Sequence, residues 1–158
     1  MHVLYIKNNM NIHHILFAST LAALCMTSCL SAGNSAKETD SGEGYKTFET
    51  GEFKELIASD VEVYVAIGEP TGELRLEAAP SVINDIEVEN RQGSLSINDR
   101  NDKSGKEGTD KAKAYITVGP SQLHTIIASA GAEIILQQPT DAEIFETDAT
   151  VSISPGSF

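Results

Sequence analysis

Two pairs of carboxylates are the residues of this sequence whose type and spacing could do chemistry. Asp60 and Glu62 stand two positions apart in one alternating stretch, and Glu87 and Glu89 do so in another. Because side chains two positions apart lie on the same face of a β-strand, each pair is expected on one strand face. Enzymes that cleave polysaccharides use two neighbouring carboxyl groups. The solvated outer face of a strand explains both pairs without any chemistry, so the sequence predicts no catalytic residue.

Nucleophilic and metal-dependent chemistry lack suitable residues in the region that is expected to fold. Three of the four histidines lie within the first 14 residues, and the fourth, His124, follows Leu123 in an alternating segment and is predicted to point outward. Both cysteines, Cys25 and Cys29, precede residue 30. A hydrolytic triad needs a histidine beside its nucleophile, and a transition-metal site needs several ligands. We therefore predict a protein that is not an enzyme and that has no metal site and no cofactor.

The composition and charge of the chain favour one β-rich domain with an acidic surface. Its 158 residues are 41% hydrophobic, include no tryptophan and are rich in valine, isoleucine, threonine and serine, a composition typical of strands. The formal net charge is -12, and Lys7 is the only charged residue among the first 28. An acidic surface repels phosphate groups, so the sequence argues against nucleic acid as a partner.

Residues 1–28 have the pattern of a secretory signal peptide. Lys7 supplies a weakly positive start, and an apolar run follows it over residues 15–26 (ILFASTLAALCM). This run is too short to span a bilayer comfortably. Translation could begin at Met1 or at Met10, and the second start would leave no fixed positive charge before the run.

The signal ends in residues 26–29, Met-Thr-Ser-Cys, which resemble the lipobox of bacterial lipoproteins. In that class the cysteine is acylated, so the resemblance implies that Cys29 carries a lipid anchor, with palmitate among its chains, that holds the protein at a membrane. A disulfide or an ordinary signal-peptide cysteine is the alternative. Leu30 and Ser31 lack the aspartate that retains lipoproteins at the inner membrane, which implies the outer membrane. Residues 29–47 are small and polar and are predicted to form a flexible linker.

The stretch at 123–136 (LHTIIASAGAEIIL) recurs elsewhere in the chain and indicates a stack of short strands. The sequence Ile-Ala-Ser at 57–59 returns at 127–129. Short strands that recur with small-residue corners about every 20 residues are typical of a stacked β-coil. We therefore predict an all-β, β-helix-like domain over residues 48–158. With a shift of 18 positions, Ile126, Ile127, Ser129 and Ile135 fall on Ile144, Phe145, Thr147 and Ile153.

Alternating apolar residues predict the individual strands of this domain. In the first strand, Val61, Val63 and Val65 are expected to face the core. Gly93 is expected to close a hairpin between the third and fourth strands. Residues 98–112 lack large apolar side chains and are interpreted as a solvated loop. Besides the recurring segments, the predicted strands lie at 61–67, 74–78, 86–89, 95–97 and 113–118.

Five short motifs follow one another along the domain. They are Phe53-x-x-Leu56, DVEVYVAIG at 60–68, LRLEA at 74–78, INDIEVENRQGSLSI at 83–97 and AYITVGPSQLHTIIASAGAEI at 114–134. In this order they resemble the head domain of autotransporter adhesins, also called the GIN domain. The resemblance implies a right-handed β-helix in a lipoprotein of the cell envelope. It also implies repeats that continue beyond the end of this chain, so the domain is expected to be incomplete.

Together these features predict a lipid-anchored envelope protein with a non-catalytic binding or adhesin-like role. The predicted binding face comprises Ser129 and Thr147, which recur at the corners of two repeats, and the acidic residues Glu62 and Glu133. A glycan or a protein is the expected ligand, besides the membrane that holds the anchor. The alternatives are a polysaccharide-processing enzyme on the same β-helix and a truncated copy with no independent function.

Overall fold

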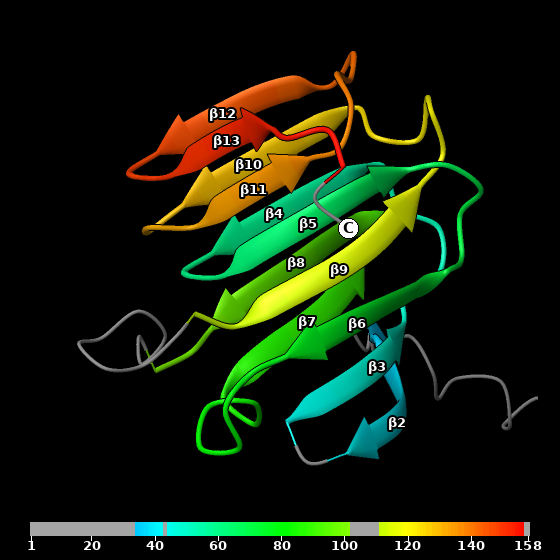
Figure 1. Cartoon of the computed structure of the whole chain (residues 1–158). Helices are drawn as coiled ribbons and strands as arrows, with labels where there is room; N and C mark the ends of the chain where they lie inside the picture. The colour runs from blue at the N-terminus through cyan, green and yellow to red at the C-terminus, as the bar shows by residue number, and fades with distance from the viewer. Residues whose placement is uncertain (1–33, 43, 102–110, 157–158) are drawn as a thin grey trace, which may run out of the picture. The chain divides into compact units, whose positions relative to one another are not determined.

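The computed structural model describes residues 34–42, 44–101 and 111–156 (Figure 1). The predicted signal peptide, the predicted lipidation site Cys29 and the centre of the predicted loop at 98–112 lie outside the described residues. Residues 33–158 form one compact unit. Its described part is all β, with 13 strands. The described residues contain no helix that could cross a membrane.

The strands form two sheets, sheet A and sheet B, in agreement with the predicted all-β stack (Figure 1). The described end strands of each sheet are paired on one side only, so neither sheet closes into a barrel. In spatial order, sheet A contains β1 (Asn34–Ser35), β7 (Ile86–Arg91), β8 (Ser94–Asp99), β4 (Glu55–Ser59), β10 (Thr125–Ser129) and β12 (Glu143–Thr147). Sheet B contains β13 (Thr150–Ile153), β11 (Glu133–Leu136), β5 (Glu62–Ile67), β9 (Lys113–Val118), β6 (Glu73–Glu77), β3 (Tyr45–Glu49) and β2 (Lys37–Gly42).

Four rungs make up the regular part of the stack, and each rung is one strand of sheet A followed by one strand of sheet B. Strands β8, β4, β10 and β12 run parallel in sheet A. Strands β9, β5, β11 and β13 run parallel in sheet B. Parallel pairing requires long connections between the paired strands, and each of these connections passes through at least one strand of the other sheet. Antiparallel strands extend both sheets beyond β8 and β9.

Tight corners connect the two strands of three rungs, and each corner holds one non-glycine residue in the left-handed region. These residues are Asp60, Ala130 and Asp148, with φ angles of 54°, 49° and 51°. Small or short polar side chains tolerate this conformation better than branched ones do. The corner between β10 and β11 also contains Gly131, with a φ of 78°. The predicted small-residue corners are confirmed, and their backbone conformation gives the reason for their composition.

The rungs do not follow one another in chain order. The rung of β8 and β9 lies on one side of the rung of β4 and β5, and the rung of β10 and β11 lies on the other side. After β5 the chain forms β6 and β7, returns as β8 and β9, and then crosses to the far side as β10 (Figure 1). A spiral of successive turns would place β8 beside β10. Strands β4 and β5 are therefore central although they come first among the rungs.

The strand register between the last two described rungs confirms the predicted 18-residue shift in sheet A, but the shift in sheet B is 17 residues. In sheet A, Ile126 pairs with Ile144, as the predicted shift of 18 requires. In sheet B, Ile135 pairs with Ser152 and not with Ile153 as predicted. The corner between β12 and β13 is one residue shorter than the corner between β10 and β11, which reduces the shift by one.

The structured domain begins earlier than the sequence predicts. The predicted flexible linker at 29–47 contains strands β1 and β2 and the start of β3. β1 pairs with β7, and β2 pairs with β3, which pairs in turn with β6. These short polar strands are held by backbone hydrogen bonds to a neighbouring strand. They lack an alternating apolar pattern, so hydrophobic periodicity does not predict them.

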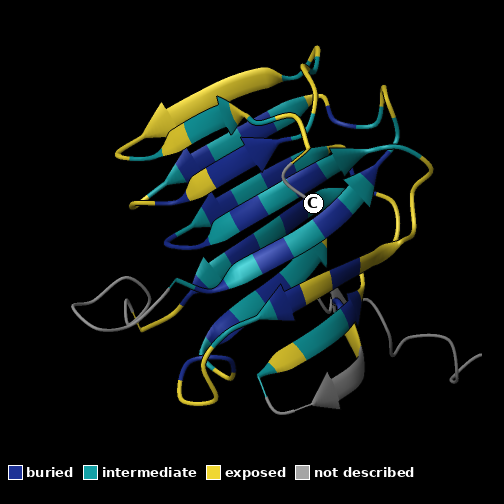
Figure 2. Cartoon of the chain, viewed as in Figure 1, coloured by how far each residue is buried: buried dark blue, intermediate teal, exposed yellow. Residues whose placement is uncertain are grey.

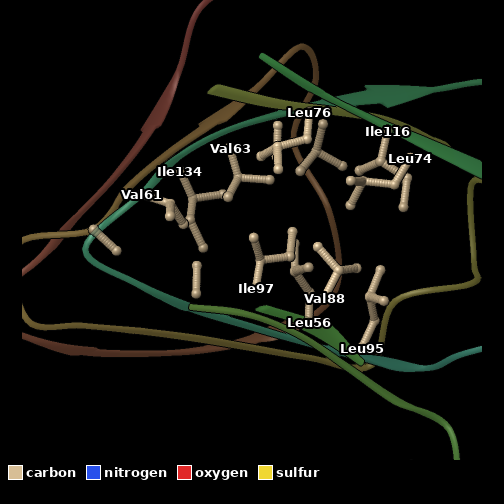
Figure 3. Packing of buried hydrophobic residues seen from close by; sticks show 14 of the residues in the cluster. Leu56, Val61, Val63, Leu74, Leu76, Val88, Leu95, Ile97, Ile116 and Ile134 are labelled. Atoms are coloured by element: carbon tan, nitrogen blue, oxygen red, sulfur yellow. The ribbon is translucent and has the colours of Figure 1, made fainter. Parts of the chain in front are cut away.

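Apolar side chains fill the space between the two sheets (Figure 3). Val63 and Ile134 of sheet B face Leu56 and Ile97 of sheet A, and all four side chains are 0% exposed. Burial of apolar surface is the main favourable term in folding, so these inward faces define the fold. Because the inward faces are buried, side chains that bind a ligand must lie on the outer faces of the sheets. Further fully buried side chains, including two of the predicted first strand, are Val61, Val65, Leu74, Leu76, Leu95 and Ile126.

The rung of β12 and β13 is the exposed end of the stack. Every residue of β12 is exposed (Figure 2). Ile144, Phe145 and Ile153 are 43%, 54% and 52% exposed. Ile126, the partner of Ile144 on the next rung, is 0% exposed. The same inward position is therefore buried within the stack and open on its last described rung.

Candidate functional site

The predicted binding residues lie in two pairs, one on the outer face of each sheet. Ser129 at the end of β10 pairs with Thr147 at the end of β12. Glu62 at the start of β5 pairs with Glu133 at the start of β11. Ser129 and Glu133 flank the same corner, so both pairs lie along one edge of the stack while facing outward from different sheets. The structure brings the members of each pair together, and their role in binding stays a prediction.

The surroundings of the two carboxylate pairs explain these residues without a catalytic role. Asp60 is a buried corner residue with a left-handed backbone. The prediction that it shares a strand face with Glu62 is therefore wrong. Glu87 and Glu89 do lie on one face of β7, and an arginine pairs with each of them. The Arg100 guanidinium donates two hydrogen bonds to Glu87 and lowers the pKa of that carboxyl. The general acid of a glycoside hydrolase needs a raised pKa, so Glu87 does not fit that role.

His124 is exposed at the entry to β10, as predicted. Its backbone N–H donates to the Lys54 carbonyl, and its own carbonyl accepts from the Glu143 N–H. Together with loop residues such as Thr50 and Phe53, it lines a depression of about 850 Å³. Within residues 34–156, as far as they are described, no group of three or more histidine, cysteine, aspartate or glutamate side chains could hold a metal ion.

The outer face of sheet B carries a stacked pair of tyrosines that the sequence did not predict. Tyr64 of β5 and Tyr115 of β9 are register partners, with ring centroids 5.0 Å apart and ring planes 13° from parallel. The Tyr64 hydroxyl donates to the Glu62 carboxylate, and this hydrogen bond, together with burial, raises the pKa of Tyr64 to about 12. Burial and the neighbouring Glu77 raise the pKa of Tyr115. Alternation places each ring on an outer face, but their contact depends on strand neighbours that alternation does not reveal.

Replacing Glu62 with glutamine is expected to lower the pKa of Tyr64 from about 12 toward its ordinary value of 10.0. The reason is that the carboxylate that stabilises the neutral phenol is removed. Because the folded-state pKa lies above the ordinary value, the interaction stabilises the fold fully below pH 10.0 and its contribution is lost as the pH rises toward 12.

The measurement is a pH titration of the tyrosine ring signals by NMR spectroscopy. Glu69→Gln, in the exposed turn after β5, is the control and should leave the titration unchanged. A Tyr64 pKa that stays near 12 in the Glu62→Gln variant would contradict the assigned hydrogen bond.

Over residues 52–154 the chain matches the protein family described as "Putative auto-transporter adhesin, head GIN domain". The chain belongs to this family. The match includes the motifs at 53–134 that carried the resemblance, and it extends through the last rung of the stack. The family description thus names a class of binding proteins.

Solved structures share the fold of this GIN-domain chain. One is described as a "putative adhesin" from Bacteroides fragilis, at 16% sequence identity and a TM-score of 0.57, covering 69% of this chain and 51% of that chain. Another is described as a "Putative lipid binding protein" from Parabacteroides distasonis, at 12% identity and a TM-score of 0.50, covering 69% of this chain and 50% of that chain. At these identities the likeness shows the fold alone. The chain spans about half the length of these structures, and no curated protein matches it.

Proposed function

We propose that this chain is the head of a lipid-anchored protein of the cell envelope and that it binds a ligand through the outer faces of its sheets without catalysing a reaction. Membership in a family described as an adhesin head supports the proposal. The observation that carries it is the arrangement of outward side chains in rows that cross neighbouring rungs.

On sheet A one row consists of hydroxyl side chains, and the row beside it is apolar. Neighbouring strands lie about 4.8 Å apart, so similar side chains repeat at a short, fixed spacing. The buried core behind each sheet holds the rows in place, which reduces the entropy lost on binding. Such a surface suits an extended ligand. The two rows are Ser59, Ser129 and Thr147, and Ile57, Ile127 and Phe145.

The anchor in this proposal is a lipid on Cys29, which would attach the domain to the outer membrane. The apolar run at 15–26 and the lipobox-like residues 26–29 support it. Several acyl chains on one cysteine would hold the protein stably, whereas a single chain binds a membrane only marginally.

Metabolic labelling with palmitate in a bacterial host tests the anchor. The wild-type chain is expected to incorporate the label and to partition into the detergent phase, and Cys29→Ala is expected to abolish labelling. Cys25→Ala is the matched control, because it removes the other cysteine and should keep the label. A wild-type chain that stays unlabelled and soluble would overturn the anchor.

The binding role is tested separately with residues 33–158, the compact unit that contains the whole described core. This domain would be applied to an array that carries neutral glycans, anionic glycans and extracellular proteins. Saturable retention on any of these classes supports a binding module. Absence of retention on all of them would overturn the role.

A further inference from the structure

The stacked tyrosines belong to a row of outward side chains that crosses five strands of sheet B. Ile135 of β11, Tyr64 of β5, Tyr115 of β9, Arg75 of β6 and Thr47 of β3 are register partners in this order. We call these five residues the tyrosine row. In Figure 2, buried and partly buried residues alternate along β5 and β9, as expected for strands with one outward face. The row therefore lies on the outer surface, backed by the core.

The second ring face of Tyr115 is directed along this row. One face of the ring stacks on Tyr64, and Tyr64 is backed by Ile135, which is only 6% exposed although it is on the outer face. In a stack that runs from strand to strand, the other face of Tyr115 turns toward β6. There, a depression of about 470 Å³ is lined by Tyr115, Arg75 and Thr117. Tyr115 thus forms an aromatic wall of this depression.

Charged side chains surround the same depression. Glu73 and Glu77 line it together with Arg75. The Arg75 guanidinium forms an ion pair with Glu77 at 2.7 Å and lies 5.6 Å from the centre of the Tyr45 ring. These contacts hold Arg75 in place while its side chain stays 61% exposed. The depression therefore offers fixed hydrogen-bond donors and acceptors next to an aromatic surface.

We propose that the depression beside Tyr115 binds one sugar unit of a neutral oligosaccharide. The face of an aromatic ring carries negative charge, so the weakly positive C–H groups of a pyranose ring can pack on Tyr115. The sugar hydroxyls would donate to Glu73 and Glu77 and accept from Arg75. This inference rests on the binding role proposed above and names its ligand class and its site.

The charge and size of the site favour a neutral sugar over other ligands. The chain has a net charge of -12, and Glu62 and Glu133 lie together near the start of the tyrosine row, so anionic glycans and phosphates are repelled. A wholly apolar ligand would leave the charged groups of the rim desolvated and unpaired. A folded protein partner usually covers about 800 Å² on each side, so it would extend far beyond the nine residues that line this depression.

Neutral oligomers of glucose, galactose, mannose and N-acetylglucosamine are the probes, and saturation-transfer NMR with residues 33–158 is the readout. At least one oligomer is expected to bind the wild-type domain. Tyr115→Ala is expected to weaken binding about tenfold or more, as for the loss of a central aromatic contact. Tyr115→Phe keeps the ring and should stay within about threefold of wild type. Ile153→Ala, at an exposed apolar residue of β13 that lies outside both proposed binding surfaces, is the control and should bind as wild type does.

Arg75→Ala provides a second test in case Tyr115→Ala disturbs the fold, because the Arg75 side chain is largely exposed. It is expected to weaken binding of the same oligomer several-fold. Failure of every neutral oligomer to bind, or wild-type affinity in both Tyr115→Ala and Arg75→Ala, would overturn the sugar site. If the array instead retains the domain on an anionic glycan or a protein, and Tyr115→Ala does not alter that retention, the sugar site is wrong and the binding role stands.

Discussion

Replacing Ile126 with alanine is expected to lower the free energy of unfolding by about 3 kcal/mol, the typical loss for a large apolar side chain in a well-packed core. Ile126 is 0% exposed and lies on β10, between β4 and β12 in sheet A. The strands on both sides restrict collapse around the cavity. The loss therefore includes both the transfer free energy of the deleted atoms and the cavity itself.

Ile144→Ala is the matched control for this measurement. Ile144 has the same side chain and occupies the partner position on β12, but it is 43% exposed. Its replacement should lower the free energy of unfolding by less than about 1 kcal/mol. Both values come from urea denaturation of residues 33–158 followed by circular dichroism, since the chain has no tryptophan. Equal losses of unfolding free energy in the two variants would contradict the exposure of Ile144 on β12.

The inward faces of the strands could be predicted from the sequence because alternation in a strand follows directly from backbone geometry. Val61, Val63 and Val65 are all 0% exposed, and so are Leu74 and Leu76 of β6. Small residues at the corners were also recognisable, since few residue types tolerate the left-handed conformation found at Ala130 and Asp148. These features depend only on local sequence.

The order of the rungs could not be predicted in this way. Alternation tells which face of a strand is buried, but it does not tell which strand lies beside it. Ile57 and Ile127 pair across 70 positions of sequence, whereas β8 and β10, which follow one another in the stack predicted from repeats, lie on opposite sides of β4. The stacked tyrosines were missed for the same reason, because Tyr64 and Tyr115 become neighbours only when β9 pairs with β5.

A disulfide between β4 and β10 is expected to form and to stabilise the domain, which tests this order directly. Ser59 and Ser129 are register partners on adjacent parallel strands and are both partly buried on the outer face. Neighbouring strands are about 4.8 Å apart, within the separation that a disulfide can bridge. Residues 33–158 contain no native cysteine, so Ser59→Cys combined with Ser129→Cys leaves one possible bond.

The expected gain in the free energy of unfolding on oxidation is up to about 4 kcal/mol, because the bond closes a loop of roughly 70 residues in the unfolded chain. The control combines Asn98→Cys on β8 with Ser129→Cys. Asn98 pairs with Ser59 on the other side of β4, so it lies about two strand spacings, roughly 10 Å, from Ser129 and cannot reach it. Thiol titration and denaturation with and without reductant give both readouts. A spiral of successive turns would instead place β8 beside β10, and oxidation would then close the control pair and leave the first pair reduced.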